Sequence, residues 1–81
     1  MTLREAIRDV LARADKPCRV LFIVSEIKRR GIYRTRDGFS PPRAHVQACI
    51  SQDHKRDDGW FWRPSPGEVA LAEWREPSAN G

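Results

Sequence analysis

The first fourteen residues constrain the fold most strongly, because they combine a helix start signal with an apolar pattern of helical period. Thr2 and Glu5 have the spacing of a capping box, in which the threonine hydroxyl accepts from the Glu5 amide and the glutamate carboxylate accepts from the Thr2 amide. Apolar residues recur at the i, i+3, i+4 and i+7 positions, namely Leu3, Ala6, Ile7, Val10, Leu11 and Ala14. Pro17 cannot continue a helix. The sequence therefore predicts an amphipathic helix over residues 3–14.

A second helix is predicted over residues 21–30, after a short extended piece at 18–20. Its apolar stripe consists of Leu21, Val24 and Ile27, and is widened by Phe22 and Ile23. Gly31 stands where a left-handed residue commonly ends a helix, because glycine has no Cβ to clash there.

A third helix is predicted over residues 41–54, after a loop at 32–40. Ser40 is suited to the N-cap, and the prolines at 41 and 42 suit the first turn, where a missing amide costs nothing. The apolar edge of this helix is narrow and consists of Val46, Cys49 and Ile50. The helix therefore has surface available for a partner, unless Ala44 and Ala48 pack inward.

Two short strands are predicted after the helices, at residues 60–63 and 68–71. The Pro-Ser-Pro-Gly turn between them allows the strands to pair as a hairpin, and Trp74 just beyond would close the core. Residues 76–81 are small and polar, which predicts a flexible C-terminal tail. The expected architecture is one α+β domain over residues 1–75, with three helices followed by a β-hairpin.

Size and cysteine content limit the class of protein. At 81 residues, with 40% hydrophobic and 32% charged residues, the chain has the composition of a folded domain with a single core. Cys18 and Cys49 are too few for a disulfide-stapled secreted scaffold. The N-terminus lacks the apolar run of a signal peptide, and no segment approaches transmembrane length. We expect a cytoplasmic protein that does not associate with membranes.

Positive charge is concentrated in one segment. Residues 28–43 contain six basic side chains and one acidic side chain, a net charge of +5, whereas the whole chain carries +4. The rest of the sequence is therefore nearly neutral. Such a local excess favours DNA or an acidic protein surface as a partner, although a solvated loop would also account for it.

Several segments, in their order and spacing, resemble the HARE-type helix-turn-helix domain. They are residues 2–6, 17–20, 26–27, 33–35, 44–50, Pro66-Gly67 and the closing Leu71-Ala72-Glu73-Trp74, so the resemblance extends over about residues 2–74. The family occurs in restriction endonucleases, in chromatin-associated regulators and, in a related form, in the delta subunit of bacterial RNA polymerase. The resemblance implies a winged helix-turn-helix, with the hairpin as its wing, and a role in DNA transactions. The second proline before the third helix, and Glu68 and Val69 after the wing turn, depart from the family pattern.

A winged helix of this kind is expected to bind double-stranded DNA through its third helix. Arg43 could pair with guanine and Gln47 could contact adenine, while Ser51 and Lys55 continue along the same face. Phosphate contacts are expected from Lys28, Arg29, Arg30, Arg34, Arg36 and Arg63. The expected role is in transcription regulation or restriction-type defence, with association with the nucleoid.

A protein interface is the alternative. A polymerase- or nuclease-associated adaptor or inhibitor would use the same basic patch against an acidic protein face. Trp60 and Trp62 lie two residues apart in the predicted strand at 60–63. We expect both to pack, but an exposed tryptophan would mark a contact with a protein or a nucleotide. The oligomeric state stays open.

No motif points to catalysis. His45 and Cys49 lie four residues apart on the third helix, with His54 nearby, but no Cys-x-x-Cys pair accompanies them, so no metal site is predicted. No serine or cysteine lies in a nucleophile motif, and the glycines are scattered rather than grouped in a phosphate loop. We expect a binding protein without enzymatic activity, metal or cofactor.

Overall fold

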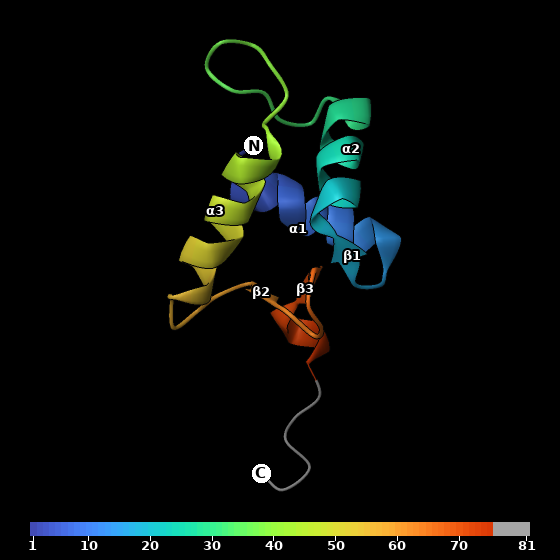
Figure 1. Ribbon diagram of the computed structural model, residues 1–81, viewed down its shortest axis with the longest axis vertical. Coiled ribbons are helices and arrows are strands. Elements are labelled where there is room, and N and C mark those ends of the chain that lie inside the picture. The colour runs from blue at the N-terminus through green and yellow to red at the C-terminus, as the bar shows by residue number, and fades with distance from the viewer. Residues whose placement is uncertain (76–81) are drawn as a thin grey trace, which may run out of the picture.

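The computed structural model describes residues 1–75, which form three helices over a small sheet (Figure 1). In chain order the elements are α1 (Leu3–Ala14), β1 (Cys18–Arg19), α2 (Val20–Arg30), α3 (Arg43–His54), β2 (Phe61–Trp62), β3 (Glu68–Leu71) and the 3-10 helix η1 (Ala72–Trp74). The predicted α+β winged helix-turn-helix is confirmed. The predicted tail at 76–81 lies outside the described residues.

The ends of α1 and α2 follow the local signals in the sequence. The Glu5 amide donates to the Thr2 hydroxyl at 3.1 Å and the Thr2 amide donates to the Glu5 carboxylate at 2.8 Å, so the predicted capping box is present. Gly31 ends α2 in the left-handed conformation, with φ of 61°. Both predictions are confirmed.

The buried stripe of α2 differs from the predicted one. The helix begins at Val20, and its buried residues are Val20, Ile23 and Ile27. Leu21, assigned to the stripe from its spacing, is 60% exposed. The apolar run at the start of the helix is so wide that either of two helix faces could be the buried one. Val20 faces the core because it directly follows the paired strand β1, which sets the direction in which the helix starts.

The start of α3 was also predicted wrongly. The helix begins at Arg43, and Pro42 rather than Ser40 is its N-cap, with an extended φ of −71° and ψ of 162°. The reason is the double proline: a residue that precedes proline is kept out of the helical region, so neither Ser40 nor Pro41 can be helical. Pro41 is instead buried against the rest of the molecule.

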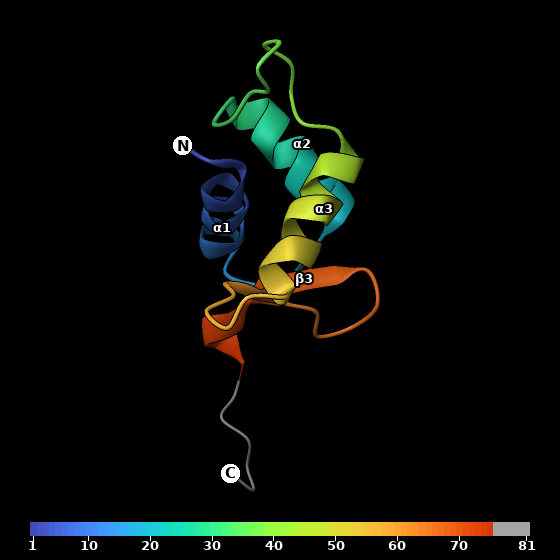
Figure 2. The ribbon, with the colours of Figure 1, turned by 90° about the vertical axis from the view of Figure 1, so that its left-hand side faces the viewer.

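The sheet has three antiparallel strands in the order β1-β3-β2. The predicted hairpin is confirmed, with Phe61 opposite Leu71 and Trp62 opposite Ala70, although β2 is shorter than expected. The pairing of β1 with β3, which places Cys18 opposite Val69 and Arg19 opposite Glu68, was not predicted. The strand β3 runs across the end of the helices (Figure 2) and ties the wing to the start of α2.

A single core lies between the helices and the sheet. Its buried members come from α1, α2, α3 and all three strands, and include Ile7, Leu11, Ile23, Ile50 and Val69. Trp60 and Trp74 pack against this core as half-buried side chains, and Trp62 is half-buried as well. The expectation that the hairpin tryptophans pack is therefore confirmed for Trp60, whereas Trp62 lies beside the Arg75 guanidinium, 5.7 Å from its ring centre.

One charged side chain, Asp53 of α3, is buried within residues 1–75. Its carboxylate accepts from the Arg4 side chain at 2.7 Å and from the Trp60 and Phe61 amides at 2.8 and 2.9 Å. The Arg4 guanidinium lies 3.7 Å from the centre of the Trp60 ring. These contacts join α1, the end of α3 and the start of β2, and so fix where the wing leaves the helices.

Candidate nucleic-acid interface

The outer face of α3 is open to solvent and lined by small or polar residues. Ala44, Ala48, Ser51 and Lys55 follow the i, i+4, i+7, i+11 spacing of one helix face, and all four are exposed. The two alanines therefore do not pack inward. Because the alanine side chains are short, another surface can approach the α3 backbone closely along this face.

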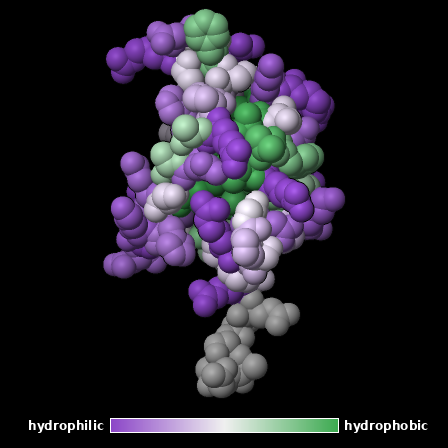
Figure 3. Space-filling model, in the orientation of Figure 1, coloured by the Kyte–Doolittle hydropathy of each residue, from purple (hydrophilic) through white to green (hydrophobic). Residues whose placement is uncertain are grey.

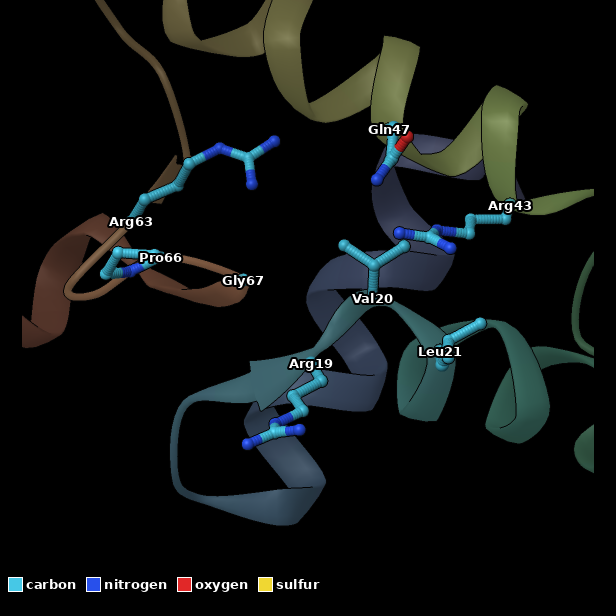
Figure 4. Close-up of a pocket in the computed structure, with 8 residues that line it drawn as sticks. All are labelled: Arg19, Val20, Leu21, Arg43, Gln47, Arg63, Pro66 and Gly67. Atoms are coloured by element: carbon cyan, nitrogen blue, oxygen red, sulfur yellow. The ribbon is translucent and has the colours of Figure 1, made fainter.

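A groove of about 330 Å³ borders this face, between α3, the start of α2 and the wing. It is lined by Arg19, Val20, Leu21, Arg43, Gln47, Arg63, Pro66 and Gly67. In Figure 4, Arg43 and Gln47 reach down from α3 and Arg63 reaches across from the wing, while Arg19 and Leu21 lie along the edge formed by β1 and α2. Figure 3 shows hydrophobic surface between α2 and α3 with hydrophilic side chains around it.

The groove is strongly electropositive. Three arginines line it, no acidic residue does, and the ion pairs of residues 1–75 leave Arg19, Arg43 and Arg63 without carboxylate partners. Unpaired guanidinium groups are free to form charge-assisted hydrogen bonds with phosphate. The lining therefore suits an anion that also has apolar surface.

The first turn of α2 adds backbone donors to the edge of the groove. Its N-cap residue, Arg19, forms no side-chain capping hydrogen bond, and no acidic residue lies in the first turn. The amides at a helix N-terminus lack partners within the helix and lie at the positive end of its dipole, an arrangement that favours phosphate.

The structure separates the ten predicted site residues into three groups. Arg43, Gln47 and Arg63 meet in the groove, and Ser51 and Lys55 continue along the exposed face of α3. Arg34 and Arg36 lie in the loop that leads into α3, and both are exposed. Lys28, Arg29 and Arg30 lie at the C-terminal end of α2, whereas the groove borders its N-terminal end.

Two of the α2 arginines have partners within the chain. Arg29 forms two hydrogen bonds with Glu26, at 2.9 and 2.8 Å, and these bonds lower the pKa of that carboxyl below its ordinary value. Arg30 pairs with Asp9 of α1 and its side chain is only 15% exposed. Arg30 thus joins two helices, a structural role that its place in a basic cluster did not indicate.

Arg19 is the functional candidate that sequence reasoning missed. It lies outside the basic segment at 28–43, and its position in the groove depends on the pairing of β1 with β3. The signal that could have revealed it is topological. If the strand before the second helix pairs with the wing, the start of that helix, rather than its end, lies next to the wing.

The two thiols have the properties of structural cysteines. Burial raises the pKa of Cys18 and of Cys49 above the ordinary value for a thiol, so the reactive thiolate is disfavoured at both positions. Among the described residues, no three histidine, cysteine or acidic side chains are grouped as metal ligands would be.

A three-stranded wing beside an open, basic third helix defines a winged helix-turn-helix module of the DNA-binding type. The chain belongs to the HARE-HTH family, the helix-turn-helix domain of ASXL proteins and restriction endonucleases, which it matches over residues 1–74. This family is a DNA-binding one rather than a catalytic one. No curated protein and no solved structure matches the chain. Within residues 1–75, no helix is both long and apolar enough to cross a membrane.

Proposed function

We propose that the protein binds double-stranded DNA with the exposed face of α3 in the major groove. Arg43 and Gln47 then contact base edges, while Arg63, Arg19 and the first turn of α2 hold the flanking phosphates. Ser51 and Lys55 extend the contact along α3. The biological role that we propose is transcription regulation or restriction-type defence.

The observation that carries this proposal is the groove, which is lined by arginines from β1, α3 and the wing and by no acidic residue. A core-building role does not explain them, because all three are exposed. Phosphates run along both edges of the groove that a recognition helix enters, so basic side chains beside α3 can contact them.

A protein partner is the second candidate function, and one observation favours it. Leu21 and Phe22 are adjacent on α2 and are 60% and 43% exposed. These side chains, rather than the half-buried tryptophans, would form the centre of a protein interface with a polymerase- or nuclease-associated partner.

The test is fluorescence anisotropy of a labelled mixed-sequence duplex, measured over a range of salt concentrations. We expect salt-sensitive binding by the wild type. Replacement of Arg19, Arg43 and Arg63 by alanine should weaken binding at least about tenfold at low salt, because it removes phosphate and base contacts together.

The matched control replaces Arg8, Arg13 and Arg56, which removes the same charge from exposed ion pairs outside the groove. Binding by this control within about twofold of wild type supports a localised interface. An equal loss in both triple variants would mean that only net charge attracts DNA. No binding by the wild type at low salt would overturn the proposal and direct attention to Leu21 and Phe22.

A further inference from the structure

The loop between α2 and α3 carries an exposed aromatic side chain. Phe39 is 70% exposed, the highest value among the large hydrophobic residues in the described part of the chain. In Figures 1 and 2 the loop projects beyond the ends of α2 and α3, and Figure 3 shows hydrophobic surface at its tip surrounded by hydrophilic side chains. The fold gains no core packing from a phenyl ring in this position.

Hydrogen bonds hold the loop in one shape. The Thr35 amide donates to the Phe39 carbonyl at 2.7 Å, the Gly38 amide donates to the Thr35 carbonyl at 2.9 Å, and the Phe39 amide donates to the Thr35 hydroxyl at 3.3 Å. Arg34 donates to the Gly38 carbonyl at 3.2 Å. Gly38 has φ of 88°, which permits the tight turn. The phenyl ring is therefore presented on a closed turn rather than on a free strand.

The loop is also anchored next to the DNA-facing end of α3. The buried Pro41 fixes the segment that follows Phe39, and the stiff Pro41-Pro42 pair leads directly into the helix at Arg43. Phe39 precedes Arg43 by four positions in the chain, so their Cα atoms lie at most about 14 Å apart. This limit is comparable with the width of the major groove, about 12 Å, so a loop at the start of a helix in that groove can extend to the neighbouring minor groove.

We propose that Phe39 is a wedge that inserts into the minor groove of the bound duplex and partly unstacks one base step. Arg34 and Arg36 hold the phosphates on either side. The inference rests on the proposed function, since α3 must first place the loop on the DNA. An apolar side chain that enters a base step kinks the duplex, so the protein bends the DNA that it binds.

The surroundings of Phe39 favour DNA over a protein partner. A protein hot spot would need further apolar surface around the ring, but the neighbours of Phe39 along the loop are Arg34, Arg36, Asp37 and Ser40. One aromatic ring with arginines beside it matches a base step between two phosphates.

The experiment uses an alternating TA duplex with 2-aminopurine in place of some adenines and a donor and an acceptor dye at its ends. The TA step is flexible, and 2-aminopurine fluorescence rises when its neighbours unstack. The wild type should raise the 2-aminopurine signal and bring the ends closer. Phe39→Ala should abolish both changes and weaken binding about 5- to 30-fold, as expected for one stacked base. Phe39→Trp should retain both changes.

The control is Arg13→Ala, which removes an exposed side chain from α1, outside the loop and the groove. It should leave both signals unchanged. Salt-sensitive binding by Phe39→Ala with full 2-aminopurine and bending signals would overturn the wedge and leave the proposed function intact. An absence of wild-type binding in anisotropy would overturn the proposed function and the wedge with it. Circular dichroism of each variant verifies folding.

Discussion

At the scale of the residue, Asp53 has the most demanding environment in the described chain. Its buried carboxylate accepts hydrogen bonds from Arg4 and from two consecutive backbone amides, those of Trp60 and Phe61. A buried charge of this kind is tolerated because hydrogen-bond donors surround it. Removal of one partner leaves the remaining buried groups without hydrogen bonds, which costs free energy of folding.

Asp53→Ala should therefore lower the free energy of unfolding by about 3 kcal/mol, because it leaves two amides and a partly buried guanidinium without their acceptor. Urea titration followed by tryptophan fluorescence measures the loss. Asp58→Ala is the control, because Asp58 pairs with Arg56 in solvent, with a side chain that is 73% exposed, and its removal should barely change the midpoint. Equal losses in the two variants would contradict the role assigned to Asp53.

Gly59 owes its identity to the close approach of the same residue, Asp53. A Cβ at this position would lie 2.7 Å from the Asp53 carbonyl oxygen and 3.1 Å from one carboxylate oxygen. Gly59→Ala should destabilise the fold by about 1–3 kcal/mol in the same urea titration, since backbone must move to admit the methyl group. If Gly59→Ala left the free energy of unfolding unchanged, the turn into β2 would be free to shift.

At the scale of the element, the α1 capping box makes stability depend on pH. Hydrogen bonds from Thr2 lower the pKa of Glu5 below its ordinary value. A lowered folded-state pKa contributes stability that is fully present above the unfolded value, near ~4.3, and is lost as the pH falls through the folded value.

The advantage of the wild type over Glu5→Ala in unfolding free energy should thus shrink between about pH 5 and about pH 3. Denaturant titrations at several pH values, followed by circular dichroism, provide the measurement. Glu5→Gln is the control, because it offers an acceptor that does not titrate. A difference that stays constant down to about pH 3 would show that the carboxylate does not act through its charge.

At the scale of the whole molecule, the basic side chains outside α3 that we propose contact DNA form two groups. Arg19 and Arg63 lie beside the wing, and Arg34 and Arg36 lie in the loop before α3. In a plot of log affinity against log salt, the slope counts phosphates neutralised. Replacement of Arg19 and Arg63 by alanine should reduce that slope by about two. Replacement of Arg34 and Arg36 by alanine should reduce it by about two more.

Anisotropy titrations of the two double variants and of the combined variant test whether the reductions add. If the reductions add, one duplex contacts both groups at once. The reason is that phosphate contacts made at separate places on the DNA contribute independently to the slope. A slope unchanged by the loop variant would contradict the contact between the loop and DNA.

Much of the fold could be predicted because its signals are local. The capping box, Gly31 and the hairpin turn each depend on residues only a few positions apart. The errors arose where two local rules competed: proline suits a first turn, but a second proline bars the residue before it from the helix. The burial of Asp53 has no local signal, since its partners are distant in the chain or are backbone amides.

The candidate site could be predicted only in part. Arg43, Gln47 and Arg63 lie together in the groove, but the dense basic run at 28–30 proved a poor guide to position. Charge density along the sequence does not reveal which helix end meets the wing. That geometry depends on the pairing of Arg19 with Glu68, a register between distant segments.

The central place of β3 has a consequence for how the molecule is made. This strand holds both the early strand β1 and its own hairpin partner β2, and its Val69 and Leu71 complete the core. During synthesis the three helices emerge first, yet their shared apolar face stays open until β3 leaves the ribosome. A chain that lacks β3 can form helices but not this closed fold, and the groove beside α3 forms in the same late step as the core.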